Sequence, residues 1–111
     1  MKLFEEIKSY SSWNFCLHSY ANENLVIAGD INLTYHHSIE IVFQTVSYLQ
    51  IPGQEFMINS VRYATEDETK SIEDYVEIIP DEDKVFALEL TTTNNDKTFF
   101  IAAQDIKLKK V

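Results

Sequence analysis

Three side chains near the start of the chain could support nucleophilic chemistry. Asn14, Cys16 and His18 stand at alternate positions, so an extended strand would place them on one face. A cysteine beside a histidine is the raw material of a thiol nucleophile. Side chains at alternate positions of a strand point in parallel, however, and no helix N-terminus is evident to lower the pKa of the thiol. We therefore expect a half-buried thiol beside an outward histidine, and no catalytic residue.

The same strand face leaves one alternative open. Tyr20 continues the alternation after Cys16 and His18, so the three side chains could line a pocket in a curled sheet. The alternative function is accordingly a small-molecule-binding or cryptic enzymatic domain with a pocket near Cys16 and His18. Because the strand faces offer few inward polar residues, we rank this alternative below a protein-interaction module.

Metal and cofactor motifs are weak in this sequence. His36 and His37 are adjacent, so on an extended backbone they face opposite ways and rarely bind one ion. His18 could lie near one of them, but three histidines without a fixed spacing are a weak zinc signal. The acidic runs lack the alternating ligands of a calcium loop. Two glycines cannot supply a nucleotide-binding motif, so we expect no bound metal and no cofactor.

Half of the chain's acidic residues lie in one stretch. Residues 66–83 hold nine carboxylates and one base, Lys70, so this stretch carries −8 of the formal charge of −9. A field this localised favours a basic partner surface. With no catalytic signature elsewhere, the sequence predicts a non-enzymatic protein–protein interaction module, for example immunity- or inhibitor-like, that binds a basic partner. The residues expected to contact that partner are Glu66, Asp67, Glu73, Asp74, Glu77, Asp81, Glu82 and Asp83.

Charge and composition also limit the partners and the compartment. The nine bases are scattered apart from Lys107, Lys109 and Lys110, so nucleic-acid binding is not expected. The longest uncharged apolar runs are far shorter than the roughly 20 residues of a spanning helix, so no membrane association is expected. One cysteine excludes an intrachain disulfide. We expect a cytoplasmic protein of one domain, residues 1–111; a homo-oligomer would be compatible with either function.

Hydrophobic periodicity predicts a mainly β chain. Two-residue alternation indicates six short strands, at 13–20, 25–33, 39–51, 56–63, 84–92 and 98–109. Hairpin connections between them predict a six-stranded antiparallel meander, folded as a small sandwich or as a half-open barrel. Helical spacing predicts one or two short helices, at about 2–10 and 66–78, so an α+β arrangement is the alternative class.

The acidic stretch itself has two interpretations. Thr65 and Glu68 match a capping box, and four apolar residues follow with helical spacing, namely Ile72, Tyr75, Val76 and Ile79. A helix would dock this apolar face on the sheet and display carboxylates from the other face. The competing interpretation is an acidic loop followed by a short strand at 75–79. We favour the helix.

Two of the predicted strands change their apolar phase partway. The phase slips after Thr45 in strand 39–51, and near Asn59 and Ser60 in strand 56–63. One extra residue in a β-bulge moves every later side chain to the opposite face. The sequence thus predicts a bulge in each of these strands. Gly29, inside strand 25–33, indicates a further bulge or a close approach of its backbone to a neighbour.

Overall fold

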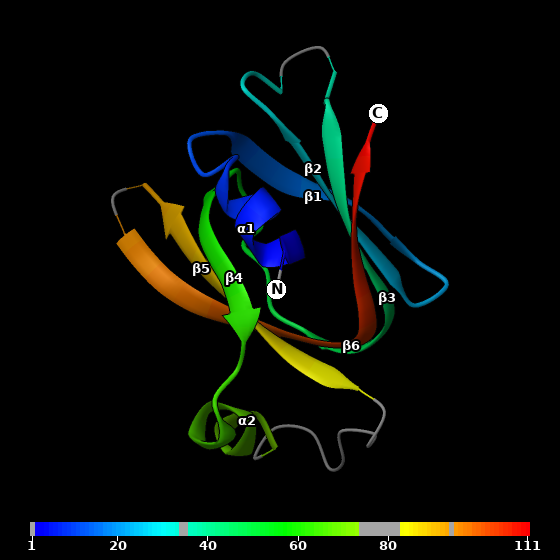
Figure 1. Ribbon diagram of the computed structural model, residues 1–111, viewed down its shortest axis with the longest axis vertical. Coiled ribbons are helices and arrows are strands. Elements are labelled where there is room, and N and C mark those ends of the chain that lie inside the picture. Colours follow the sequence, from blue (N-terminus) through cyan, green and yellow to red (C-terminus); the bar gives the residue numbers. More distant parts are fainter. Residues whose placement is uncertain (1, 34–35, 74–82, 94) are drawn as a thin grey trace.

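The structure, a computed structural model, describes residues 2–33, 36–73, 83–93 and 95–111. Figure 1 shows a curved sheet with one helix in its hollow and a second helix outside it. In chain order the elements are α1 (Lys2–Lys8), β1 (Asn14–Ala21), β2 (Asn24–Asp30), β3 (Ile39–Leu49), β4 (Met57–Tyr63), α2 (Glu66–Glu73), β5 (Lys84–Thr92) and β6 (Asn95–Lys110). The predicted mainly β class, with antiparallel strands and short helices, is confirmed.

The strand order is β1-β2-β3-β6-β5-β4. It consists of two three-stranded meanders, β1-β2-β3 and β4-β5-β6, which are joined where β3 pairs with β6. A single six-stranded meander would instead pair β3 with β4. The long strand β6 makes the joint, because its first part pairs with β5 and its later part with β3.

The sheet curls until its two edges nearly meet (Figure 1). The edge strand β1 touches the opposite edge at one bridge, between Phe15 and Phe56. Each of these residues donates its backbone N–H to the other's carbonyl, at 2.8 and 2.9 Å. Beyond this bridge the sheet stays unclosed. Of the two predicted forms, the structure is therefore the half-open barrel rather than the two-sheet sandwich.

The hollow of the curled sheet holds the core. Phe15, Phe43 and Phe86 are fully buried there, and the rings of Phe43 and Phe86 pack edge to face. Helix α1 contributes Ile7 to this core and places Phe4 against Phe86. Burying one such side chain is worth about 1.5–3 kcal/mol. The short helix is thus held by the apolar contacts of one face.

Both predicted bulges are present. The pairing of β3 with β6 shifts between Val46 and Tyr48, and Thr45, just before the shift, has a positive φ of 55°. The pairing of β4 with β5 shifts between Ile58 and Ser60. A third shift, which was not predicted, lies in β1 between Leu17 and Ser19. It leaves His18 as the extra residue of the edge strand.

Gly29 marks a close approach rather than a bulge. It pairs in regular register with Phe15 of β1 and Ile39 of β3. A Cβ atom at this position would lie 2.4 Å from the Phe15 ring, so only glycine leaves room for the ring. Phe15 can therefore lie directly against the β2 backbone and fill the core.

Neither helix of the described residues is long and apolar enough to cross a membrane.

Candidate functional site

Helix α2 begins with the predicted capping box. The Thr65 backbone N–H donates to Glu68 Oε1 at 2.8 Å, and the Glu68 N–H donates to Thr65 Oγ1 at 3.2 Å. These bonds satisfy two donors that the first turn of a helix leaves without an intrahelical partner. The helix is confirmed over Glu66–Glu73. The rest of the predicted helix, 74–78, and the competing strand at 75–79 lie outside the described residues.

Glu68 also joins α2 to the edge strand β4. Arg62 donates to both Glu68 oxygens, from Nη1 at 2.7 Å and Nη2 at 3.0 Å. Arg62 Nε reaches Glu89 at 3.4 Å, and the Ser60 hydroxyl donates to the same carboxylate at 2.9 Å. The hydrogen bonds from Arg62, and then from the Thr65 amide, lower the pKa of Glu68 to about 2. Glu68 is therefore engaged within the fold.

Of the predicted apolar face of α2, Ile72 lies within the described residues, and it docks the helix on the outer face of the sheet. Ile72 is only 2% exposed and packs with Val85 of β5 and Ala102 of β6. Tyr48 and Phe100 close around this contact. This small cluster is separate from the main core inside the barrel. It fixes the direction in which the remaining side chains of α2 point.

The predicted partner-binding acids divide into three groups. Glu66, Asp67 and Glu73 are exposed on α2, and we call them the acidic helix surface. Asp83 is partly buried and accepts a hydrogen bond from the Ser47 hydroxyl. The other predicted residues lie outside the described residues, namely Asp74, Glu77, Asp81 and Glu82.

A second polar group includes His37 of the segment between β2 and β3, and Figure 1 shows this segment at the opposite end of the long axis from α2. His18, His37 and Glu40, which we call the histidine cluster, have ligand atoms that all lie within 4.8 Å of one another. His37 Nε2 is 2.8 Å from Glu40 Oε2, and the His18 and His37 rings have centroids 4.7 Å apart. Among the described residues, this is the group with the geometry of a metal site.

The histidine cluster is assembled from three segments. His18 comes from the β1 bulge, His37 from the segment before β3, and Glu40 from the outer face of β3. Glu40 alternates with Ile39 and Ile41, which point into the core, so its carboxylate must face outward. The sequence analysis noted that His18 could lie near His36 or His37, but it missed Glu40. The three-residue spacing of His37 and Glu40 was the feature of the sequence that could have indicated that these two side chains lie together.

A neighbouring carboxylate organises the segment that carries His37. Asp30, at the end of β2, is largely buried and accepts a hydrogen bond from the Ser38 hydroxyl at 2.6 Å. This bond, helped by backbone N–H groups of Ile31 and Asn32 and by nearby His36, lowers the pKa of Asp30. The Ser38 N–H also donates to the Gly29 carbonyl. The return of the chain toward β3 is thereby tied to β2.

Cys16 takes no part in the histidine cluster. Its thiol is partly buried, and burial followed by the nearby Glu55 carboxylate raises its pKa. A raised pKa keeps the thiol protonated and disfavours nucleophilic chemistry. Tyr20 is exposed, as is His18. The small-molecule pocket near Cys16 and His18 stays a prediction.

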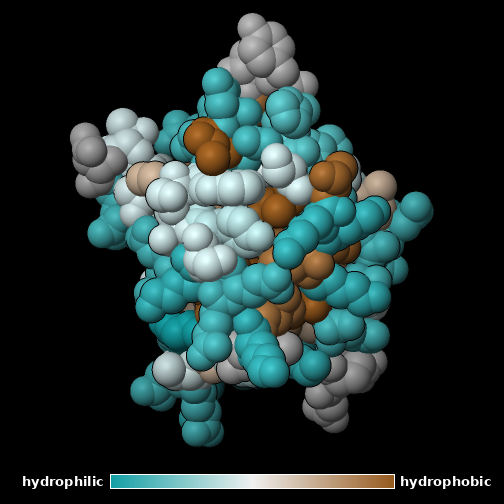
Figure 2. Space-filling model, turned by 45° about the horizontal axis from the view of Figure 1, so that its top comes forward, coloured by the Kyte–Doolittle hydropathy of each residue, from teal (hydrophilic) through white to brown (hydrophobic). Residues whose placement is uncertain are grey.

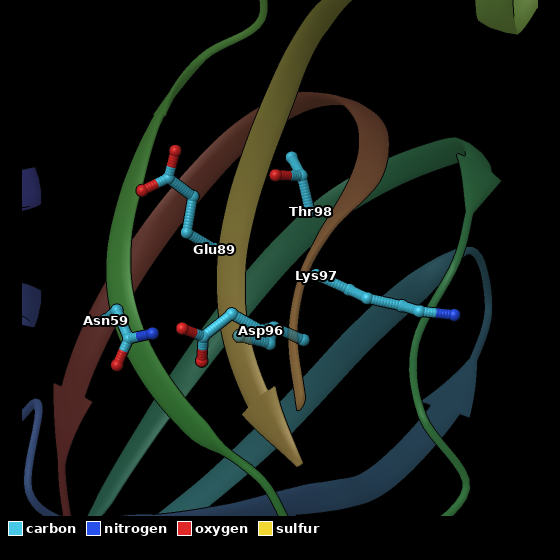
Figure 3. A pocket seen from close by; sticks show the side chains of 6 residues that line it. Asn59, Glu89, Asp96, Lys97 and Thr98 are labelled. Carbon is cyan, nitrogen blue, oxygen red and sulfur yellow. The ribbon is translucent and has the colours of Figure 1, made fainter. Parts of the chain in front are cut away.

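Two surface pockets of the described residues lie away from these side chains. The one in Figure 3, of about 330 Å³, lies between β4, β5 and β6; Asn59 and Asp96 face one another in it, and Lys97 points away. Three of its polar side chains already have partners within the fold. Asn59 donates to the Thr91 hydroxyl, which donates to Asp96, and Glu89 is held by Arg62. These contacts favour a structural role for the pocket.

Apolar side chains reach the surface without forming one broad patch in the view of Figure 2. There the apolar atoms gather in a strip with hydrophilic side chains on both sides. The large exposed apolar residues come from several elements: Leu17, Tyr20, Ile31, Met57, Tyr63 and Val111. Scattered residues of this kind are normal on a folded protein.

Comparison with known proteins adds no relative to this description. No protein-family model, no curated protein and no solved structure matches the chain.

Proposed function

We propose that this protein is a non-enzymatic interaction module that binds a basic protein partner through α2. The observation that carries the proposal is that the carboxylates of this helix fall into two groups, one paired within the fold and one exposed to solvent. Glu68 is neutralised internally by Arg62, while Glu66, Asp67 and Glu73 are directed to solvent. The only base in the helix, Lys70, lies 3.9 Å from Glu66 and is itself largely exposed.

The way α2 is attached supports a defined binding surface. An isolated helix of eight residues would be marginal in water. Here the capping box, the Arg62–Glu68 pair and the buried Ile72 hold it against the sheet. Carboxylates on an ordered element lose less conformational entropy on binding than those of a flexible tail. The helix can therefore present its acids in one arrangement.

The charge distribution indicates what such a surface would contribute. Opposite charges on two partners mainly raise the rate of association and improve specificity. Salt at physiological strength screens such fields over about 8 Å. A partner with clustered Lys or Arg residues fits this surface, for example in the manner of an immunity or inhibitor protein that covers a basic target.

The test compares two triple variants of the full chain. One variant is Glu66→Lys/Asp67→Lys/Glu73→Lys, which reverses the acidic helix surface. The matched control makes the same charge change at three exposed acids elsewhere, as Glu5→Lys/Glu23→Lys/Glu55→Lys. Each protein is used as bait in an extract of the source cell, at low and at high salt. Captured proteins are identified by mass spectrometry, and their binding rates are then measured with purified components.

We expect a basic protein to be retained by the wild type and by the control, and lost by the α2 variant. The basic protein should associate with the α2 variant at least about tenfold more slowly than with the wild type at low salt, because electrostatic steering is lost. If both triple variants lose the partner equally, net charge rather than α2 is responsible. Retention of the partner by the α2 variant would contradict the proposal directly.

A further inference from the structure

We propose that the histidine cluster is a binding site for one transition-metal ion, with Zn²⁺ as the ion that fits it best. This inference does not depend on α2 or on a protein partner. It rests on the positions of His18, His37 and Glu40, which come together from three separate segments of the chain.

The donor atoms are close to the separations that one ion requires. Zinc binds imidazole nitrogen and carboxylate oxygen at about 2.0–2.2 Å, so two ligands of a tetrahedral ion lie about 3.3 Å apart. His37 Nε2 and Glu40 Oε2 are 2.8 Å apart, and one ligand atom from each of the three residues lies within 4.8 Å of the other two. An ion bound here would replace the contact between His37 and Glu40, and His37 would bind it through a ring nitrogen that carries no proton. The His37 and Glu40 ligand atoms would also move apart, from 2.8 Å to about 3.3 Å, and the His18 ring would rotate toward them.

The burial of the three side chains suits this adjustment. The side chains of His37 and Glu40 are only 20% and 16% exposed, so packing holds them near their present positions. His18 is exposed, at the extra residue of the β1 bulge, and its ring can turn at low cost. Two ligands are thus positioned in advance, while the third closes on the ion from the edge strand.

The types of ligand select the kind of metal. Two imidazoles and one carboxylate suit zinc and neighbouring transition metals, whereas magnesium and calcium prefer oxygen ligands throughout. Three protein ligands leave a fourth position of a tetrahedral ion open to water or to a group from another molecule. The site is therefore the kind that binds an ion together with a further ligand, rather than a closed structural site.

The experiment uses the full chain without a histidine tag, after a chelator has been added and removed by dialysis. Zn²⁺ binding is followed by titration calorimetry, and Co²⁺ serves as a second probe because its visible absorption reports the ligand geometry. We expect one Zn²⁺ per chain. We also expect a Co²⁺ spectrum typical of four- or five-coordinate nitrogen and oxygen ligands.

Three variants distinguish the proposed ligands from nearby groups. His18→Asn and Glu40→Gln should each weaken Zn²⁺ binding at least about tenfold, since each removes a direct ligand. His36→Asn is the matched control, because His36 is next to His37 in the chain yet outside the cluster, with a side chain 77% exposed. Its affinity for Zn²⁺ should equal that of the wild type.

Circular dichroism establishes that each variant is folded before its affinity is compared. His18 and His36 are both exposed, so neither substitution should disturb the fold. If Glu40→Gln does not fold, the comparison of His18→Asn with His36→Asn decides the matter. The proposal is overturned if the folded wild type binds neither metal, if His18→Asn binds as well as the wild type, or if His36→Asn is weakened equally.

Discussion

Helix α2 and the histidine cluster are both polar surfaces on the outer side of one sheet, but they are built in different ways. The contacts that begin α2 are local, since Thr65 and Glu68 are three residues apart and Arg62 lies just before them. The histidine cluster joins His18 to residues about twenty positions later, through the pairing of β1, β2 and β3. The first surface follows from neighbouring residues, and the second from the topology of the sheet.

Because of this difference, the two surfaces suit different kinds of ligand. The acidic helix surface offers charge to solvent and so suits a large partner with opposite charge. The histidine cluster offers convergent ligand atoms at a partly buried position and so suits one small ion. The segment that carries His37 and helix α2 lie at opposite ends of the molecule (Figure 1), so the two surfaces can be altered separately.

The largest expected effect is on the attachment of α2. Ile72→Ala removes most of the buried side chain that docks this helix on Val85 and Ala102. We expect a loss of about 2–4 kcal/mol in the free energy of unfolding, as for other buried isoleucines cut to alanine. Urea denaturation followed by circular dichroism measures it. Partner binding should weaken as well, because the helix is then less ordered.

The matched control makes the same substitution in the other half of the molecule. Ile31 directly follows β2 and is 69% exposed. Ile31→Ala should change the free energy of unfolding by no more than about 0.5 kcal/mol. If Ile72→Ala lowers the free energy of unfolding as little as this control does, the account of how α2 docks on the sheet is wrong.

A smaller effect is expected from the ion pair at the start of α2. Glu68→Gln keeps the reach needed for the capping box but removes the charge that faces Arg62. Because Arg62 is partly exposed, we expect a loss of about 0.5–1 kcal/mol in the free energy of unfolding at neutral pH. Glu66→Gln, at an 87% exposed side chain, should cost less than about 0.3 kcal/mol.

The same pair makes stability depend on pH with a definite sign. The pKa of Glu68 is about 2 in the folded chain, and about 4.3 in an unfolded chain. A lowered pKa stabilises the folded state above the unfolded value, and this stabilisation is lost as pH falls from about 4.5 toward 2. The difference between wild type and Glu68→Gln should therefore shrink across this range. A difference that stays constant down to pH 2 would rule out the ion pair as its source.

Much of the fold could be predicted because burial imposes a period of two on half-buried strands. The bulges of β3 and β4 were predicted because their apolar side chains change face. The pairing of β3 with β6, in place of the β3–β4 pairing of a single meander, was not predicted, since periodicity does not tell which strand pairs with which. The start of β6 was also missed, because Asn95, Asp96 and Lys97 are polar and exposed, and resemble a turn.

The two candidate surfaces were predictable to different degrees, because a local spacing can be found in the sequence and the pairing of distant strands cannot. The capping box of α2 is a spacing of three residues and can be found in any sequence. The bulge that turns His18 toward His37 lies where Leu17, Ser19 and Tyr20 are all exposed. A strand that is exposed on both faces has no apolar phase to slip, so nothing in the sequence marks the bulge.

The most direct test of the contrast between these surfaces is an NMR titration. The uniformly ¹⁵N-labelled, tag-free chain is titrated with Zn²⁺, and the backbone amide signals are followed residue by residue. We predict that signals near His18, His37 and Glu40 shift or broaden, while those of α2 stay in place. Shifts centred on α2, or no shifts in any signal, would contradict the assignment of metal binding to the histidine cluster.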